Sequence, residues 1–367
     1  MSDFEIREFT LPGSANEEWI AYCRMNTDDS VEALGPQGPR NSPEADLRAA
    51  HAALTESRVR RWLAWVKDRP VGFARLVVDL VDEPEGAMAH VYVRPGYRRR
   101  GIGQALAEVV QSALEPGTRY VNLEVPTPVP GPGDEALPSP VGEGALLASS
   151  PRARFALRYG FVLGQVMWYS RYEFAAPAVA LSDVLATAGA AAGPDYEVHC
   201  LEGEVPPGWA AGVAALKQSM STDAPPGGLI IPETSWDADR VHAEYARFSS
   251  TNRLFLGIVV HEPTGRVVAL NELSASREWP DGMIHQRDTI VLSEYRGHRL
   301  GTLVKAANLE AVHAALPQAP AVHTFNAAEN HHMLAVNENL GFRRAAALGM
   351  FQAVREPVES AAQSGQT

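Results

Sequence analysis

The sequence contains almost no lysine, only two cysteines and no long apolar run. The three lysines are Lys67, Lys217 and Lys305, against abundant arginine, an imbalance typical of GC-rich coding. Cys23 and Cys200 lack the spacing of metal ligands, so we expect two reduced, buried thiols and no metal. No apolar run approaches the roughly 18–20 residues of a membrane span. The N-terminus lacks the features of a signal peptide, so we expect a cytoplasmic protein without a membrane partner.

Basic residues are also in short supply relative to acidic ones. The formal net charge of −12 argues against a nucleic-acid partner, which needs a basic face, and mildly favours cationic small substrates. A chain of 367 residues is too long for one hydrophobic core and suits two domains, in a monomer or a homodimer.

One pattern is present twice. "YRRRGIGQAL" at 97–106 and "YRGHRLGTLV" at 295–304 share a tyrosine, an arginine and a glycine at the same offsets, and Gly103 and Gly301 are 198 residues apart. The first half is expected to contain helices at 16–35 and 43–58, strands within 60–80, at 87–93 and at 119–125, a helix from Gly101, and a closing segment at 157–174. The second half repeats this order, with strands at 196–202, within 253–275, at 287–292 and at 321–327, helices at 208–221, at 237–250 and from the second glycine turn to about 316, and a closing segment at 339–354. The sequence therefore predicts an internal duplication.

The domain boundaries follow from the repeat. We expect an N-terminal domain at 1–174, a partly helical linker at 175–194, a C-terminal domain at 195–356 and a disordered tail at 357–367. The Pro/Gly-rich stretch 126–145 is surplus to the second copy, so we expect a surface loop without regular structure and without a part in the core.

The repeated glycine turn has a chemical use. A strand that enters a basic, glycine-bearing turn and opens a helix presents consecutive N–H groups and the positive end of the helix dipole to a phosphate. Many strand–helix turns contain glycine for steric reasons alone, but here the turn occurs twice in the same context.

These residues resemble the acetyl-CoA signature of the GNAT acyltransferases. Residues 98–103 match it fully, whereas in 296–301 Arg299 stands in the place of Gly101. The second signature of the family is matched in copy two by Asn330, Met333 and the Gly341-Phe342 pair, with Asn337 at its tyrosine, while copy one keeps only the Gly-Phe pair at 160–161. The resemblance covers both halves and implies a mixed α/β protein of two tandem GNAT folds, an arrangement similar to that of mycothiol synthase.

The resemblance implies acetyl-CoA as the acyl donor, up to one per domain. The loop amides would hold the pyrophosphate, and the preceding strand would pair with the pantetheine arm. The expected CoA-binding residues are Val91, Val93, Arg98, Arg99, Gly101, Ile102, Gly103 and Gln104 in copy one, and Val291, Arg296, His298, Arg299, Leu300, Gly301, Thr302 and Asn330 in copy two. Arg299 still offers an N–H and a guanidinium to phosphate; alternatively, copy two has lost CoA binding.

Acetyl transfer to an amine needs a base on the strands that face the thioester. The first candidates in copy two are Glu272 and Asp288, with His285 next, and strand alternation predicts that Gln286 and Asp288 share a face. The alternative for each carboxylate is a structural ion pair or a solvated edge. Copy one offers Asp79, His90 and Glu124.

The family's tyrosine donates a proton to the departing sulfur, and Asn337 can donate only a hydrogen bond. A thiol with a pKa of about 8.5 leaves tolerably as a thiolate, so transfer is expected to be slowed rather than abolished. The alternative is that Asn337 has only a structural role in its helix.

The acceptor is expected over the segment between the first two helices of each domain. In copy two this segment, 222–241, holds carboxylates and an aromatic suited to a cationic amine, unless they only cap helices: Asp223, Glu233, Trp236, Asp237 and Asp239. The copy-one counterpart, 27–44, holds Asp28, Asp29 and Glu32.

The resulting hypothesis is an acetyl-CoA-dependent N-acetyltransferase that acts on a primary amine of a small, cationic metabolite. The C-terminal domain would be catalytic, and the N-terminal domain would bind acetyl-CoA in support. The alternatives are a non-catalytic CoA-binding protein and a protein whose N-terminal domain is the catalytic one.

Overall fold

The computed structural model describes residues 3–35, 42–223 and 225–355, so the tail expected at 357–367 lies outside the described residues. The first half contains β1 (Glu5–Phe9), α1 (Glu17–Leu34), α2 (Pro43–Ala52), β2 (Ser57–Val66), β3 (Arg69–Asp79), β4 (Gly86–Val93), α3 (Ile102–Ser112), β5 (Tyr120–Thr127), β6 (Ala136–Pro138), β7 (Ala145–Leu147), α4 (Pro151–Arg158) and β8 (Val162–Glu173). The second half contains α5 (Leu181–Ala192), β9 (Tyr196–Glu202), α6 (Pro207–Asp223), α7 (Ala238–Ser249), β10 (Asn252–His261), β11 (Arg266–Ser276), β12 (Ile284–Val291), α8 (Leu300–Ala315), β13 (Ala321–Ala327), α9 (His331–Leu340) and β14 (Arg343–Val354).

The repeated order of elements agrees with the sequence, and the linker contains the helix α5. The helix expected over 43–58 ends earlier, at Ala52, because the chain extends into β2 from Ser57. Local signals mark the helix starts: Asn16 caps α1, and Ser42 caps α2 with Pro43 at the first helical position. None of the described helices combines the length and the apolar character that a bilayer span requires.

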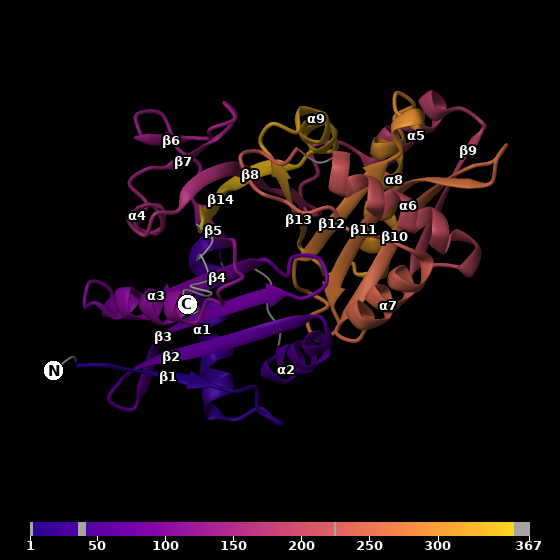
Figure 1. The fold of residues 1–367 in the computed structure, drawn as a ribbon. Coiled ribbons are helices and arrows are strands. Elements are labelled where there is room, and N and C mark those ends of the chain that lie inside the picture. The colour runs from indigo at the N-terminus through magenta and orange to yellow at the C-terminus, as the bar shows by residue number, and fades with distance from the viewer. Residues whose placement is uncertain (1–2, 36–41, 224, 356–367) are drawn as a thin grey trace, which may run out of the picture.

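The strands of both halves form one continuous sheet of 12 strands, shown in Figure 1. Its order is β1-β2-β3-β4-β5-β14-β8-β13-β12-β11-β10-β9. Sequence analysis expected each closing strand to complete its own half. Instead, β8 of the first half pairs with β13 of the second, and β14 of the second pairs with β5 of the first. The two closing strands are therefore exchanged, and they pair with each other at the centre of the sheet.

Helices cover both faces of the sheet. Asn271 and Glu272 are consecutive on β11, so their side chains point to opposite faces. Asn271 accepts a hydrogen bond from Asn308 on α8, whereas Glu272 contacts Lys217 on α6 and Tyr245 on α7. Helix α8 therefore covers one face of the second half, and α6 and α7 cover the other. The first half has the same two layers, with α3 packed on one set of strand residues and α1 on the other.

The Pro/Gly-rich stretch 126–145 differs from its expectation. It contains β6, which pairs with β7 in a small antiparallel sheet. Leu137 packs against a core cluster that includes the fully buried Leu146 and Ala328 of the second half. At Gly144, an added Cβ would lie 2.7 Å from the Cβ of Ala328. The stretch is therefore partly regular and packs where the two halves meet.

The two cysteines are free, but only one is buried as expected. Cys23 on α1 is buried, whereas Cys200 is exposed because it lies on β9, the edge strand of the sheet.

Candidate active site

The two glycine turns have the same backbone conformation with different residues. Copy one places Arg99 (φ 62°) and Gly101 (φ 83°) in the left-handed region, and copy two places Gly297 (φ 91°) and Arg299 (φ 54°) there. Each copy therefore holds one glycine and one arginine at the same two positions. The left-handed conformation costs a non-glycine residue roughly 1–2 kcal/mol. Arg299 nevertheless adopts this conformation at the position that Gly101 occupies in copy one.

The first arginine of each turn fixes the turn to its strand. Nε of Arg98 donates to the carbonyl of Val93 over 2.8 Å, and Nε of Arg296 donates to the carbonyl of Val291 over 3.2 Å. Arg98 is in addition bound to Glu32 on α1, at 2.6 Å. The expected phosphate-binding arginine of copy one therefore has an internal carboxylate partner.

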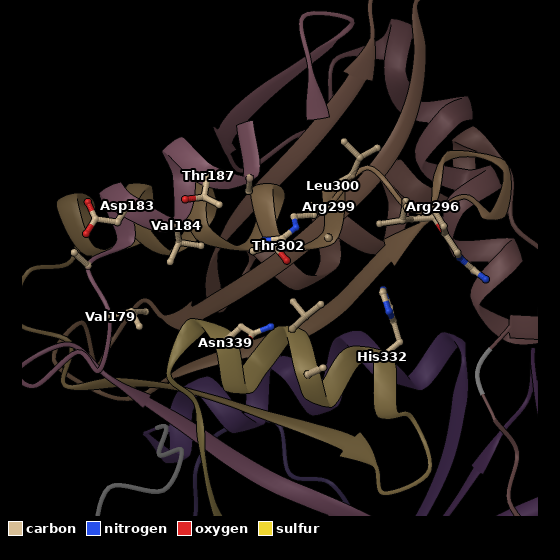
Figure 2. Close-up of a pocket in the computed structure, with 17 residues that line it drawn as sticks. Val179, Asp183, Val184, Thr187, Arg296, Arg299, Leu300, Thr302, His332 and Asn339 are labelled. Carbon is tan, nitrogen blue, oxygen red and sulfur yellow. The ribbon is translucent and has the colours of Figure 1, made fainter. Parts of the chain in front are cut away.

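A cavity of about 680 Å³ lies at the turn of copy two (Figure 2). Its wall combines the turn and the start of α8 with α5 and α9. Six of the expected CoA-binding residues line it: Val291, Arg296, Arg299, Leu300, Gly301 and Thr302. The α5 wall, including Asp183 and Thr187, comes from the linker and was not expected to contribute to a site.

Two expected CoA-binding residues of copy two do not line this cavity. The ring of His298 lies 5.3 Å from that of Tyr196 at the edge of the sheet. Asn330 caps α9, because its Oδ1 accepts a hydrogen bond from the backbone N–H of Met333.

In copy one the corresponding surface is occupied by an aromatic ring. Counting from the Gly-Phe pairs, Phe155 on α4 stands in the place of Val336, which lines the cavity of copy two. A Cβ added at Gly103 would lie 3.5 Å from the Phe155 ring. The other expected residues of this copy contribute to its packing: Ile102 and Val93 are buried, Val91 packs beside them, and Gln104 donates to Glu108.

The strands that carry the sites diverge. Strand β12 pairs in parallel with β13 only at Ile284 and His285, so the remainder of β12 leaves a wedge-shaped gap toward Val291. In copy one, β4 pairs with β5 only as far as Ala89. In each copy, the strand segment expected to pair with the pantetheine arm lies beyond the last pair.

A β-bulge distinguishes copy two. Strands β3 and β4 pair in unbroken register, but between β11 and β12 the register shifts, so that Arg287 and Asp288 together oppose Glu272. The expectation that Gln286 and Asp288 share a face is therefore wrong: the extra residue breaks the alternation. Gln286 donates to Thr324 on the α8 side, and Asp288 meets Lys217 on the α6 side.

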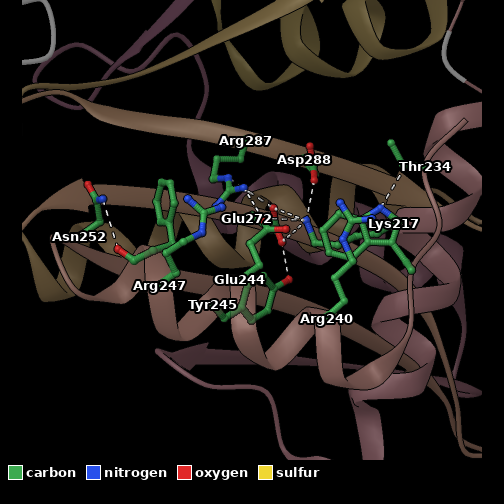
Figure 3. A network of polar contacts seen from close by, with 12 residues as sticks. Lys217, Thr234, Arg240, Glu244, Tyr245, Arg247, Asn252, Glu272, Arg287 and Asp288 are labelled. Atoms are coloured by element: carbon green, nitrogen blue, oxygen red, sulfur yellow. Dashed lines mark hydrogen bonds and ion pairs between the residues drawn. The ribbon is translucent and has the colours of Figure 1, made fainter. Parts of the chain in front are cut away.

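Both candidate bases belong to a charged cluster of Lys217, Glu244, Glu272, Arg287 and Asp288, shown in Figure 3. Lys217 lies 3.0 Å from Glu272 and 2.9 Å from Asp288. Glu272 is fully buried, whereas the Asp288 side chain is 22% exposed. Asp288 is therefore the carboxylate of this pair that a substrate can reach, and Glu272 lies behind it.

The cluster sets the ionisation of its members. Burial, reinforced by the charge of Asp288, raises the pKa of Glu272. Burial also acts to raise the pKa of Asp288, but the charges of Lys217 and Arg287 outweigh it and hold that pKa below its usual range. Burial would lower the pKa of Lys217, but the neighbouring carboxylates raise it to about 12. Lys217 is thus a permanent cation that keeps Asp288 ionised.

The third candidate, His285, lies beside another histidine. Its ring is 4.7 Å from that of His323, its neighbour in the β12–β13 ladder. Burial, with the charge of Arg287, lowers the pKa of His285 to about 4, so the imidazole is neutral at pH 7.

Copy one has a different arrangement at the same strand position. His90, the counterpart of Asp288, lies 2.7 Å from the buried Asp29 on α1. Arg152 of α4 also binds Asp29, at 2.6 Å. The other two candidates take part in neither contact: Asp79 accepts hydrogen bonds from the turn that follows it, and Glu124 is exposed.

Asn337 has partners that the sequence did not reveal. Its Nδ2 donates to Asn326 on β13 over 2.7 Å, and its Oδ1 accepts from Nζ of Lys305 on α8. Both Lys305 and Asn337 are buried. Lys305 was overlooked because a lone lysine on a helix is usually exposed; its place four residues after Gly301 was the available signal.

The segment expected to meet the acceptor combines aromatic and cationic groups. The Lys217 ammonium lies 4.8 Å from the centre of the Trp236 ring, and Arg240 lies 4.2 Å from it. Asp237 caps α7 through its hydrogen bond from the N–H of Arg240, the structural alternative noted above. Glu233 and Asp239 are exposed. In copy one Asp28 binds Arg94, and Glu32 binds Arg98.

One surface group could in principle bind a metal ion. Glu197, His199 and Glu262 bring their ligand atoms within 4.8 Å of one another at the β9 edge. Exposed acidic groups of this kind are common without a metal.

Comparison with known proteins agrees with this geometry. Residues 17–129 match the sequence model of the acetyltransferase (GNAT) family. A search among curated protein sequences finds no match.

Solved structures of tandem and related proteins share the fold across the chain. A tandem GNAT protein from the clavulanic acid biosynthesis pathway, solved without AcCoA, is 22% identical, with 96% of this chain and 99% of that chain covered and a TM-score of 0.68. A GCN5-related N-acetyltransferase from Sphaerobacter thermophilus is 13% identical, with 96% of each chain covered and a TM-score of 0.57. A putative acetyltransferase from Pyrococcus horikoshii is 14% identical, with 97% and 91% covered and a TM-score of 0.53. Residues 17–129 therefore match the GNAT family, and the chain as a whole has the fold of tandem GNAT proteins.

Proposed function

We propose that the protein transfers an acetyl group from acetyl-CoA to the primary amine of a small metabolite, and that the C-terminal domain catalyses this transfer. The observation that carries the proposal is the cavity at the second turn. Its wall includes Val291, which lies three residues beyond Asp288 on the same diverging strand. One ligand can therefore reach from the turn to the partly exposed carboxylate.

The residues divide the work as follows. The turn amides and Arg299 bind the phosphates of CoA, and the thioester lies in the gap between β12 and β13. Asp288 receives the ammonium group of the acceptor and takes up its proton, directly or through water. Lys217 positions Asp288, and Glu272 with Tyr245 positions Lys217. A cationic acceptor is supported by three carboxylates against two cations in this cluster.

The N-terminal domain binds a second acetyl-CoA in a supporting role. Its turn has the same left-handed positions as the second turn. Its interior lacks the bulge, and His90 stands in the place of Asp288.

One observation favours the reverse assignment. His90 is partly exposed and is held by the buried carboxylate of Asp29, which is how a histidine base is oriented in many enzymes. If His90 is the base, the N-terminal domain is the catalytic one.

A matched pair of substitutions tests the assignment. A Cβ at Gly301 would lie 3.6 Å from Val291 and a Cβ at Gly103 would lie 3.5 Å from Phe155, ordinary contacts that the fold should accept. Gly301→Glu and Gly103→Glu each place a negative charge against the phosphates. Calorimetry with CoA measures stoichiometry, and thiol release from acetyl-CoA measures turnover with primary amines such as putrescine and glucosamine.

We expect each variant to lose one CoA site and only Gly301→Glu to lose turnover. Loss of turnover in Gly103→Glu alone would assign catalysis to the N-terminal domain. Unchanged CoA binding in both variants would refute the turn assignments.

A further inference from the structure

Lys305 is a buried cation without an anionic partner. Its ammonium contacts Oδ1 of Asn337, the sulfur of Met333 at 3.9 Å and the face of Phe342 at 5.2 Å. No carboxylate of the described residues lies within ion-pair distance of it. A buried charge of this kind is costly unless something supplies the opposite charge.

The position of Lys305 relates it to the cavity. It lies one helical turn after Gly301 on α8, and Gly301 lines the cavity. Its two α9 contacts, Met333 and Asn337, each follow a cavity-lining residue, His332 and Val336. The ammonium therefore lies between α8 and α9, behind the wall that these helices present to the ligand.

Neighbouring buried groups on the same face also lack partners. Oε1 of Gln286 and Oδ1 of Asn308 have no hydrogen-bond donor among the described residues. Gln286 borders the gap between β12 and β13, and Asn308 follows Lys305 on α8 by almost one turn. The interior beneath the gap thus offers acceptors and a cation to a ligand that carries both N–H groups and a negative charge.

We propose that Lys305, held by Asn337, donates the proton to the CoA sulfur as the thioester breaks. The inference rests on the proposed function. The amine nitrogen bonds to the acyl carbon, the carbon–sulfur bond breaks, and its electron pair goes to sulfur. Sulfur takes a proton from Nζ of Lys305. Asp288 passes the proton of the ammonium group to water before the attack and then takes the proton that the amine loses as the amide forms. After CoA leaves, Lys305 regains a proton from water.

The ionisation of Lys305 suits this role. Burial lowers the pKa of Lys305 to about 7, and a proton donor works best when its pKa lies near the operating pH. In copy one, Ala107 and Ala156 stand at the positions of Lys305 and Asn337, so that domain has no equivalent donor.

The first test does not depend on an acceptor. In a Gly103→Glu background, which leaves only the second site, free CoA is bound and its thiol is titrated by the ultraviolet absorbance of the thiolate, with desulfo-CoA as the blank. With Lys305 present, the bound thiol should have a pKa at least about one unit below the ordinary 8.5, a tenfold gain in thiolate below that pH. Lys305→Met should abolish this shift. Lys67→Met makes the same change at an exposed lysine and should leave the shift intact.

The second test measures turnover. Lys305→Met should lower kcat about 10²-fold with little change in the KM for acetyl-CoA. It should also remove the fall in wild-type activity above pH 7 that follows deprotonation of Lys305. Adding Asn337→Tyr restores a side chain with an acidic hydroxyl and should recover at least about tenfold of the loss.

The outcomes separate the two proposals. A shifted thiol pKa without turnover of any amine would keep Lys305 beside the CoA sulfur and refute the proposed acetyl transfer. Full turnover in Lys305→Met, or a bound thiol of ordinary pKa in the presence of Lys305, would overturn this inference and leave the proposed function standing. Failure of CoA to bind at the second site would overturn both.

Discussion

The two halves share a backbone plan but differ consistently in the interior on one face of the sheet. Around the gap in the second half lie eight polar residues, and matching the strand ladders, the turn glycines and the Gly-Phe pairs gives their counterparts in the first half. The polar set is Asn271, Gln286, Thr289, Lys305, Asn308, Thr324, Asn326 and Asn337, and its counterparts are Ala74, Ala89, Val91, Ala107, Val110, Leu123, Val125 and Ala156.

The difference concerns the polarity of the buried side chains in the two halves. An apolar interior is the easier solution for stability, since buried polar groups are costly unless they are satisfied. The first half has adopted that solution, while the second keeps a buried lysine and two unpartnered acceptors. The duplication thus places an apolar version and a polar version of one interior in the same chain.

The largest expected effect is a loss of acetyl transfer, and it should distinguish Asp288 from its counterpart His90. Asp288→Asn keeps the shape of the side chain but removes its basicity, so the rate of acetyl transfer should fall about 10²–10⁴-fold while CoA affinity stays. The matched variant His90→Gln should keep at least half of the activity. Steady-state kinetics over a pH range measures both, and a greater loss in His90→Gln would reverse the comparison.

The next effect concerns the segment that only the first half contains. Leu146 is fully buried in the cluster that joins the halves, so Leu146→Ala should destabilise the protein by about 2–5 kcal/mol. Denaturant unfolding measures the change. As a control, Val129→Ala alters an exposed residue of the stretch 126–145, which Leu146 directly follows, and should shift stability by less than about 0.5 kcal/mol. An equally small change in both variants would favour the original expectation that this region has no part in the core.

A third prediction uses the buried lysine as a stability probe. Because the pKa of Lys305 is lowered to about 7 in the fold, the unfolded chain binds more protons between pH 7 and about 10.5. Stability contributed by this group therefore rises with pH across that window, by at most about 1.4 kcal/mol per unit. Lys305→Met removes the burial penalty, so it should be more stable than wild type at pH 6–7, and the advantage should shrink toward pH 10. Urea unfolding at each pH measures it, and an advantage independent of pH would contradict the burial of a charged amine.

The smallest effect tests the exchange of glycine and arginine in the turns. Arg299→Gly should relieve the left-handed strain and stabilise the protein by about 1 kcal/mol, with weaker CoA binding from the lost guanidinium. Arg99→Gly should give a similar gain in the other copy. Thermal unfolding with calorimetry of CoA binding compares them. Loss of stability in both variants would mean that the arginine side chains hold the turns.

Local patterns predicted most of the elements, and the reasons are specific. The periodicity of α8 and the alternation of β13 placed both elements to within a residue or two, since each buries one regular face. The exchange of β8 and β14 could not be predicted, because strand pairing over such separations leaves no local signal. The bulge at Arg287 and Asp288 was missed for a similar reason: a single extra residue looks like ordinary alternation until the partner strand is known.

The site shows the same division. The turns could be predicted because the same pattern of tyrosine, arginine and glycine precedes a helix in each half. The partners of the candidate carboxylates were not, since Lys217 comes from a helix 55 residues before Glu272. Sequence reasoning treated Asp288 and Glu272 as equivalent candidates, and only the structure shows that Asp288 is partly exposed while Glu272 is buried.

The exchanged closing strands also determine when the protein can fold. Strand β5 of the first half pairs with β4 on one side, and on its other side it pairs with β14, which begins more than 200 residues later. At roughly 5–20 residues per second of synthesis, the first half waits some 10–40 s with an open sheet edge. Such an edge is a template for pairing with other chains, and β14 is the last described strand to leave the ribosome. The second copy of the duplication therefore serves the first as the piece that closes it, and the two halves reach their final structure together.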